Sequence, residues 1–536
     1  MRLIGRIEEM EAPERMLRDL DLPRLLCRMD SRMDETEAVG FLQKYLCSDG
    51  EEISQRSLLL GEFREKSSRE ELDNLARDLS SLEEERRKYD QSADRVHFLL
   101  YAGRRAEIYT RCVETIGDFA SRNFTSERMR RLTEDIGRIR ETEAYRKCKA
   151  ALEEQRRLIT FPRRMGIAVN TKDDARPAEM GVLWESGEEK EWRPLVGAED
   201  TSKEPNTLFP PMSYHREQYG THFEEYLSKN LEKQWKGKIG KALELWKKIE
   251  LPDEQKIGAL AEEFAFYAVG IRVMEAFSKR GYFLCRPQAA KEPLMRSGQM
   301  VYPELALSAD KVQGNAVRLE DGGAVIVTGA NHSGKTSYLK TIGQVLLLSQ
   351  LGFYVPAADL VFRPVRKIHT LFSAGEDKDM TASRMGIEVR ILAEILEQAG
   401  PEDLVLINEP LTSTNPVEAI SICADLIQKM LQNRVSCLVV THLYDVYFLL
   451  RSTMKKEFQE RLKSLVTLAR YEERQGMIYS YQLVESEPQG TSYAMQTAES
   501  FGITLKDLIK EEKNMAKARA FCEEESTRPM YSGEEA

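Results

Sequence analysis

The sequence lacks any apolar run long enough to cross a membrane, and its first residues include acids where a signal peptide would have an apolar core. It also lacks a paired cysteine motif, because its eight cysteines are scattered without C-x-x-C spacing. Only Cys437 is followed closely by a histidine. This distribution is typical of reduced thiols and gives no ligand set for structural zinc. We therefore expect a cytoplasmic protein with no membrane partner.

An excess of basic residues is missing as well. The chain has 78 Lys and Arg against 88 Asp and Glu, so its net charge is −10. That balance argues against a surface covered with nonspecific nucleic-acid-binding groups, but it does not exclude a local basic patch. Charged residues make up 31% of the chain, a share that suits long, solvated helices. The length of 536 residues is enough for roughly two to four domains.

The most informative stretch is AVIVTGANHSGKTS, residues 324–337. An apolar, β-branched pattern predicts a buried strand before it, and a helical pattern follows toward Gln350. Between them lies the spacing G-x-x-x-x-G-K-[ST], which is the phosphate loop of nucleotide-binding proteins. The residues predicted to bind ATP are Gly329, Ala330, Asn331, His332, Ser333, Gly334, Lys335, Thr336 and Ser337.

Each position in this loop has a chemical reason. Gly329 and Gly334 let backbone N–H groups curl around an anion at distances that a Cβ would obstruct. Lys335 is expected to reach the β- and γ-phosphates, and Thr336 to offer its hydroxyl to Mg²⁺. The helix after the loop points its positive end at the phosphates. ATP and Mg²⁺ are therefore the expected ligands.

Hydrolysis needs further groups, and two later strand ends supply candidates. The apolar run LVLIN ends in Asn408 and Glu409, at the place where an acidic motif helps to hold Mg²⁺ and orients the attacking water. Glu409 is the candidate general base, and Asn408 would act on Mg²⁺ through a water. Another strand ends before His442, whose imidazole could sense the γ-phosphate. Together with Lys335, these residues predict an ATPase.

The patterns along the chain predict a multidomain protein. An all-α lever or core with a small β insertion precedes an α/β P-loop domain that has a helical C-terminal end. The predicted parts are a helical domain at 1–157, a β insertion and connector at 158–215, return helices at 216–285, the P-loop ATPase domain at 286–510 and a polar tail at 511–536.

In the first half, leucines recur at helical spacing on one narrow stripe, which indicates packing on a neighbouring helix. These leucines are Leu72, Leu75, Leu79 and Leu82. A single helix is expected over Ser126–Leu158. Strands are expected at Gly166–Asn170 and Ala178–Ser186, where the periodicity changes.

In the second half, apolar runs at Asp403–Asn408 and Cys437–Thr441 predict buried strands, and a hairpin is expected between Leu465 and Leu483. Helical patterns separate them, at Ile387–Gln398 and Pro416–Asn433. Parallel strands joined by helices predict a doubly wound sheet with its ligand at the strands' C-terminal ends.

A cluster of lysines and tryptophans lies near residue 240 and could grip a phosphate backbone. Interleaved acids such as Glu244 favour the alternative, a solvated helix face with buried tryptophans such as Trp246. The candidate DNA contacts are Lys233, Lys236, Lys238 and Lys241.

Several motifs together resemble the MutS family, the ATPases of DNA mismatch repair and their paralogues. The resemblance is strong from about Cys285 to Lys510 and weaker before. It rests on GANHSGKTSYLKT, YVPAADL at 354–360, SRMGIE at 383–388, LVLINEP at 404–410, VTHLYDV at 440–446 and SYAMQTAESFGI at 492–503. Upstream, residues 166–183 are similar to a β segment within the lever helices of some paralogues.

The resemblance implies an ATPase domain similar to those of ABC proteins, which forms head-to-tail dimers with two composite sites. In that arrangement Ser383 would reach the partner's γ-phosphate. Lever helices would couple the ATP state to a ring that holds DNA. A homodimer acting on DNA is the expectation that follows.

The sequence departs from the family pattern at three places. Asn408 replaces the usual aspartate, so Mg²⁺ affinity and turnover are expected to be reduced. The loop at Leu411–Pro416 replaces the family's Gly-Thr-Ser-Thr, which puts communication between paired sites in question. The chain begins directly with charged helices, so we expect neither a mismatch-reading domain nor a C-terminal nuclease module. Phe63 is not expected to touch a base, because its Phe-x-Glu tripeptide also occurs elsewhere in the chain, as at Phe223 and Phe458.

Three functions remain open from the sequence. The first is an Mg²⁺-dependent ATPase that clamps duplex, branched or mismatched DNA by shape and backbone. The second is an ABC-type mechanical ATPase whose lever helices act on a protein partner without DNA, which the net acidity supports. The third is a nucleotide-gated scaffold that binds ATP and hydrolyses it slowly, which Asn408 suggests.

Overall fold

The chain divides into two compact units in the computed structural model. The helical unit comprises Met1–Leu3 and Lys66–Ala268, and the α/β unit comprises Ile4–Glu65 and Val269–Ala536. The helices α4 (Gly50–Lys66) and α11 (Glu254–Lys279) belong partly to each unit. The described residues are 1–5, 8–92, 94–159, 164–171, 177–186, 232, 236–309, 311–372, 384–472 and 476–488.

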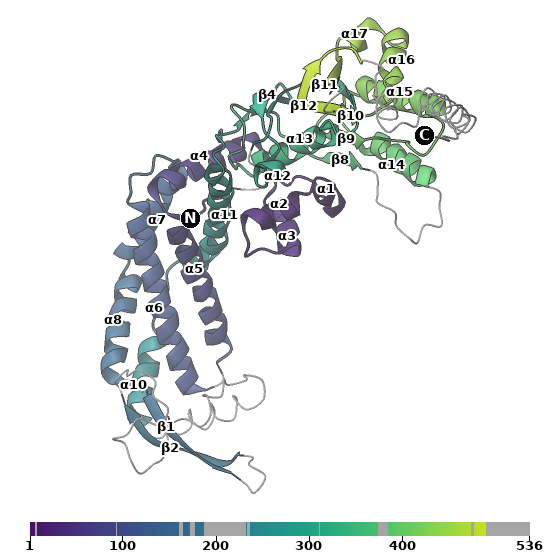
Figure 1. Ribbon diagram of the computed structural model, residues 1–536. Coiled ribbons are helices and arrows are strands. Elements are labelled where there is room, and N and C mark those ends of the chain that lie inside the picture. The colour runs from purple at the N-terminus through teal and green to yellow at the C-terminus, as the bar shows by residue number, and fades with distance from the viewer. Residues whose placement is uncertain are drawn as a thin grey trace, which may run out of the picture. The chain divides into compact units, whose positions relative to one another are not determined.

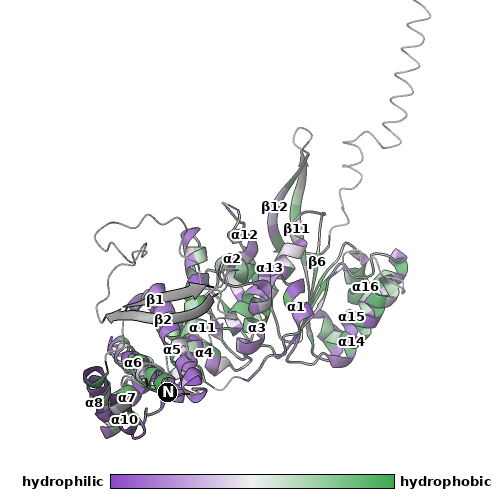
Figure 2. Ribbon diagram, turned by 90° about the horizontal axis from the view of Figure 1, so that it is seen from below, coloured by the Kyte–Doolittle hydropathy of each residue, from purple (hydrophilic) through white to green (hydrophobic). Residues whose placement is uncertain are grey.

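Long helices that lie side by side form the helical unit (Figure 1). They are α5 (Arg69–Asp90), α6 (Arg95–Ala120), α7 (Glu127–Glu141), α8 (Glu143–Leu158), α10 (Lys236–Trp246) and the first part of α11. The predicted leucine stripe is confirmed, because all four leucines of α5 are buried and α5 packs on α6. Figure 2 shows hydrophilic residues over much of α5 and α8, as expected for helices with one solvated side.

The prediction of one helix over Ser126–Leu158 is wrong, because Thr142 divides it into α7 and α8. Thr142 is extended, with φ −66° and ψ 147°, and its side chain accepts a hydrogen bond from the N–H of Tyr145 at 3.1 Å. A threonine at this position caps the next helix better than it continues the previous one. The predicted β insertion is present as an antiparallel pair, β1 (Arg164–Thr171) and β2 (Pro177–Ser186).

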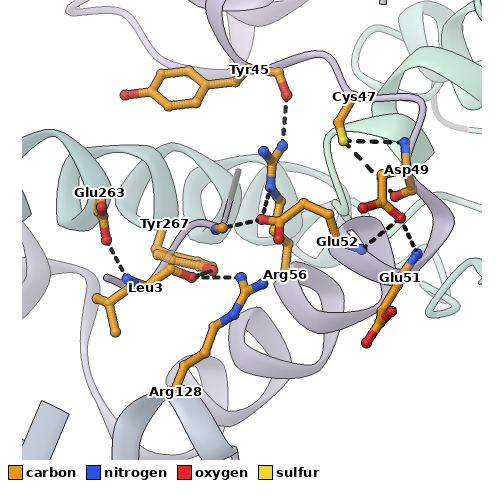
Figure 3. A network of polar contacts seen from close by, with 11 residues as sticks. Leu3, Tyr45, Cys47, Asp49, Glu51, Glu52, Arg56, Arg128, Glu263 and Tyr267 are labelled. Carbon is orange, nitrogen blue, oxygen red and sulfur yellow. Dashed lines mark hydrogen bonds and ion pairs between the residues drawn. The ribbon is translucent and has the colours of Figure 1, made fainter. Parts of the chain in front are cut away.

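The first residues of the chain are fixed within the helical unit. The N–H of Leu3 bonds to the Glu263 carboxylate, and its carbonyl oxygen accepts hydrogen bonds from Arg128 at 2.9 Å and from the Tyr267 hydroxyl at 3.1 Å (Figure 3). Two charged side chains and a buried hydroxyl thus bind the backbone N–H and carbonyl groups of Leu3. The amino terminus is therefore part of the packed structure of this unit.

A six-stranded sheet with the order β12-β11-β6-β10-β9-β8 organises the α/β unit. Five strands are parallel and β12 is an antiparallel edge strand. Buried apolar runs build its centre, which confirms the predicted strands and hairpin. The strands are β6 (Ala324–Thr328), β8 (Ile368–Leu371), β9 (Leu404–Asn408), β10 (Ser436–Val440), β11 (Leu462–Glu472) and β12 (Gly476–Glu485).

Helices cover both faces of this sheet, as the doubly wound prediction requires. One set of alternate strand residues, including Ile326, Ile407 and Val439, packs against α14, α15 and α16. The helix α13 contacts β9 and β10, and because successive strand residues face opposite sides, it covers the other face. These helices are α13 (Lys335–Gln350), α14 (Arg384–Gln398), α15 (Pro416–Gln432), α16 (Asp445–Thr453) and the short α17 (Lys456–Gln459).

A smaller sheet has the order β3-β7-β4-β5, and all of its strands except β7 precede the phosphate loop in the chain. Its strands, together with a short helix between β4 and β5, are β3 (Gln288–Ala289), β4 (Met295–Met300), α12 (Pro303–Ala306), β5 (Asn315–Leu319) and β7 (Val361–Phe362).

The N-terminal helices lie within the α/β unit. They are α1 (Glu14–Asp19), α2 (Leu22–Met29) and α3 (Glu35–Tyr45). The helix α1 contacts β8, and the turn between α1 and α2 contacts α13. Asp21 forms an ion pair with Lys340 of α13, and Gln344 donates to the Leu20 carbonyl oxygen at 2.7 Å. At Gly343, an added Cβ would lie 2.6 Å from Leu20. The helix that follows the phosphate loop is therefore enclosed by residues more than 300 positions away in sequence.

The sequence patterns predict one helical domain over residues 1–157, but these residues are shared between the two units. Residues Ile4–Glu65 belong to the α/β unit, and a helical pattern alone could not indicate on which unit they pack. A buried ion pair in α4 illustrates the packing (Figure 3): Arg56 contacts Glu52 at 2.8 Å and donates to the Tyr45 carbonyl oxygen at 2.6 Å. Burial of two charges is tolerated because they are paired and hydrogen-bonded.

Candidate nucleotide site

The predicted phosphate loop connects β6 to α13 with a backbone that only certain residues allow. Gly329 has φ +139° and Gly334 has φ +94°, values that favour glycine. His332, between them, has φ +61°, which is uncommon for a residue with a side chain. The loop thus takes the curled form that the glycine spacing predicts.

The Lys335 side chain lies inside this loop and is 4% exposed. Its ammonium donates to the carbonyl oxygens of Gly329 at 3.0 Å and Ala330 at 2.8 Å. Burial lowers the pKa of Lys335, while the Glu409 carboxylate acts in the opposite direction. The Lys335 ammonium is thus paired with two neutral carbonyl groups, and a bound anion would supply the negative charge that these groups lack.

Thr336 and Asn408 meet at the ends of α13 and β9. The Thr336 hydroxyl donates to the Asn408 side-chain oxygen at 2.9 Å. The chain thus brings together the two residues that were predicted to act on Mg²⁺. Both offer neutral oxygen atoms, which suit a hard cation that takes most of its ligands from phosphates and water.

Glu409 follows Asn408 in a left-handed conformation, with φ +49°. Its N–H donates to the Val440 carbonyl oxygen at 2.8 Å, so its backbone still pairs with β10. Two residues later, Leu411 has φ +59°, and its N–H donates to a carboxylate oxygen of Glu388 at 2.9 Å. Glu388 belongs to the SRMGIE motif, and its contact with this turn was not expected from the sequence.

A cavity of about 770 Å³ opens at the phosphate loop. Lys335, Thr336 and Glu409 line it together with Tyr481 from β12, and residues between β4 and β5 form another wall. Its volume and mixed polar lining suit a ligand of nucleotide size. Tyr481 was not predicted, because nothing in the local pattern of β12 indicates that the strand bends toward the loop.

The other predicted residues lie elsewhere. His442 follows β10 and is exposed, and it is not among the residues that line the cavity. Lys238 and Lys241 are exposed on α10, and Trp246 of the same helix is buried, as the solvated-face interpretation expects. Ser383, Lys233, the segment 492–503 and the tail 511–536 lie outside the described residues, as does the Lys236 side chain.

Two absences concern only the residues that the structure describes. Within them, no group of three or more His, Cys, Asp or Glu is arranged to hold a metal ion. Also within the described part of the chain, no helix is both long and apolar enough to cross a membrane.

A parallel sheet, a phosphate loop between its strand β6 and a buried helix, and a carboxylate at the end of β9, with β10 between the two strands, define a P-loop nucleotide hydrolase. Residues 325–518 match the family model described as MutS domain V, which is an ATPase domain. Over this domain the chain is distantly homologous to proteins of the MutS family.

Relatives support the same assignment. The chain is 29% identical to human MutS protein homolog 4 over 36% of its own length and 21% of the relative's. It is 28% identical to the DNA mismatch repair protein MutS of Thermus thermophilus over 37% of this chain and 23% of that protein. The match to MutS of Thermosipho melanesiensis is 26% identical over 55% of this chain. These matches span about a fifth to a third of the relatives' lengths.

Proposed function

We propose that this MutS-family ATPase is Mg²⁺-dependent, acts as a dimer, and uses ATP to gate its hold on DNA. The observation that carries the proposal is the pairing of Thr336 with Asn408 at a cavity that Thr336 lines together with Lys335 and Glu409. Four residues from three parts of the fold thus meet where phosphates would lie.

Each residue has a distinct role in the proposal. Lys335 leaves its two carbonyl partners and neutralises the β- and γ-phosphates. Thr336 and Asn408 hold Mg²⁺, Asn408 through a water. The bound cation would neutralise charge that develops on the phosphates during transfer. Glu409 orients the attacking water and accepts its proton.

The dimer and its composite sites rest on the family resemblance. In this proposal Ser383 reaches the γ-phosphate held by a second copy. His442 is exposed and lies outside the cavity lining, so it would approach a nucleotide only after a rearrangement or in the assembled dimer. The replacement of aspartate by Asn408 removes one negative charge from the Mg²⁺ site and is proposed to make hydrolysis slow.

The DNA part of the proposal is supported by the mismatch repair proteins among the relatives. The exposed Lys238 and Lys241 of α10 are the described side chains that we propose touch the phosphate backbone. Recognition would then depend on shape and backbone rather than on base identity. The net charge of −10 keeps a protein partner as the alternative.

The test measures ATPase rate and DNA binding across a salt series, with homoduplex, mismatched duplex and four-way-junction DNA. The proposal expects binding of at least one DNA at low salt and a change of ATPase rate upon binding. Replacing Lys238 and Lys241 with alanine should reduce the magnitude of the salt-dependence slope by about 2, if each contacts one phosphate. The matched control replaces Lys247 and Lys248, which are also exposed, and should leave the slope unchanged.

The outcomes separate the alternatives. No binding and no rate change with any DNA at low salt would discard the DNA function and favour a protein partner. Equal binding to matched and mismatched duplex would rule out a mismatch sensor. ATP binding with no measurable turnover would support the nucleotide-gated scaffold.

A further inference from the structure

The phosphate loop lies against the hairpin formed by β11 and β12. At Gly329, an added Cβ would lie 1.9 Å from the hydroxyl oxygen of Thr467 in β11. At Gly334, an added Cβ would lie 3.4 Å from the Tyr481 ring in β12. Both glycines of the loop therefore face the hairpin, and Gly329 is required by space as well as by its positive φ.

A buried chain of hydroxyl groups joins the hairpin to the loop. The Ser333 hydroxyl donates to the Ala330 carbonyl oxygen at 2.6 Å, and it lies 2.6 Å from the Thr467 hydroxyl. A serine hydroxyl has one proton, so Thr467 donates in the second hydrogen bond. Ser333 is fully buried and Thr467 is 5% exposed, so water does not substitute readily for either partner.

This chain of hydroxyls ends on a carbonyl group that Lys335 also uses. The Ala330 oxygen accepts from the Lys335 ammonium at 2.8 Å and from Ser333 at the same time. When Lys335 turns to a phosphate, Ser333 still pairs with Ala330, and Thr467 holds Ser333 in that rotamer. The loop can then keep its curled backbone while its lysine moves, which lowers the cost of ordering upon binding.

We propose that Thr467 is a positioning residue for ATP, acting through Ser333 on the backbone of the phosphate loop. The inference rests on the nucleotide site of the proposed function but not on its DNA or dimer parts. Thr467 touches no ligand itself. Its role is to fix the loop from behind in the conformation that presents N–H groups to the phosphates.

The hairpin is itself held in place, as a fixed support requires. The pairing of β11 with β12 shifts its register just after Thr467, and Tyr481 lies in this irregularity with φ +55°. Asn315 of β5 bridges it, because its side chain donates to the Tyr481 carbonyl oxygen and accepts from the Leu483 N–H, both at 2.9 Å. The smaller sheet thus anchors the strand that stands against Gly334.

The test compares four variants with the wild type: Thr467→Val, Thr467→Ser, Ser333→Ala and the double variant Ser333→Ala with Thr467→Val. Binding of a fluorescent N-methylanthraniloyl ATP with Mg²⁺ is measured without DNA, alongside steady-state kcat and KM. Valine keeps the shape of threonine and removes the hydroxyl, so Kd and KM should rise about tenfold with a smaller change in kcat. Serine keeps the hydroxyl and should restore binding to within about twofold of wild type.

The double variant should bind no more weakly than the weaker single variant, because both substitutions remove the same hydrogen bond. Thermal unfolding without nucleotide is the control. The weakening of ATP binding should be larger than any loss of stability accounts for. Wild-type affinity for Thr467→Val, equal weakening by serine and valine, or simple additivity would overturn the inference. If valine prevents folding, the serine and alanine variants still decide it. A wild type that binds no ATP would refute the proposed nucleotide site as well. A lack of DNA binding would leave the inference about Thr467 unaffected.

Discussion

The helical unit and the α/β unit both contain contacts between distant parts of the chain, but those contacts have different consequences. In the helical unit they fix the packing of long helices, as where the Leu3 N–H bonds to Glu263, while helix ends are capped locally, as in the capping box of Ser68 and Glu71. In the α/β unit, Thr336 contacts Asn408 across 72 positions, and Lys340 contacts Asp21 across 319. The helical unit should therefore tolerate single surface changes, while the nucleotide site depends on distant parts of the chain holding together.

The largest expected effect is that of Lys335→Met, which removes the charge from the loop. We expect ATP binding to weaken at least 100-fold, because Lys335 is the lysine of the phosphate loop that lines the cavity. Equilibrium titration with nucleotide measures this. Lys247→Met in the helical unit is the matched control and should bind as the wild type does, since Lys247 is exposed.

Glu388 should matter for turnover rather than for binding. Its carboxylate accepts the Leu411 N–H and so supports the turn that follows Glu409. We expect Glu388→Ala to lower kcat about tenfold while the Kd for ATP changes little, and Glu388→Gln to retain most activity because an amide oxygen can still accept. Equal loss in both variants, or a loss of binding, would contradict this positioning role.

Asn408→Asp tests whether the Mg²⁺ site lacks charge. An aspartate could still accept the Thr336 hydroxyl and would add a negative charge, so kcat should rise severalfold at low Mg²⁺ and converge with wild type at saturation. The measurement is ATPase rate against Mg²⁺ concentration. An unchanged Mg²⁺ dependence would show that Asn408 does not act on the cation.

The smallest expected effect belongs to the helical unit. Ser68→Ala removes one side of the capping box, which should destabilise the unit by about 1 kcal/mol. Thermal unfolding would report it, and the Kd for ATP should stay at the wild-type value. A change of nucleotide affinity from this variant would break the contrast between the two units.

Sequence patterns predicted what local chemistry determines. The leucine stripe of α5, the strand and helix around the phosphate loop, and the buried strands β9 and β10 all follow from periodicity and turn residues. The break at Thr142 was missed because a helical pattern continues across it, and only the cap identifies it. Periodicity alone therefore misses a helix boundary that a capping residue sets.

The contacts behind the nucleotide site were not predictable in the same way. Thr467 and Tyr481 reach the loop only because β11 pairs with β6 and β12 bends at an irregularity in register. Asp21 meets Lys340 because the turn between α1 and α2 contacts α13. None of these contacts has a local sequence signal, since each depends on which strands and helices become neighbours. The motifs identified the residues that face the phosphates, but not those that hold them in place.

The central claim is that Lys335, Thr336, Asn408 and Glu409 form one site that binds and hydrolyses ATP. The most direct test measures ATP binding and single-turnover hydrolysis for wild type and Glu409→Gln with Mg²⁺. We predict nearly equal Kd values and a hydrolysis rate at least 100-fold lower in the variant, since glutamine cannot accept the proton of the attacking water. Equal hydrolysis rates in the two proteins would contradict the account.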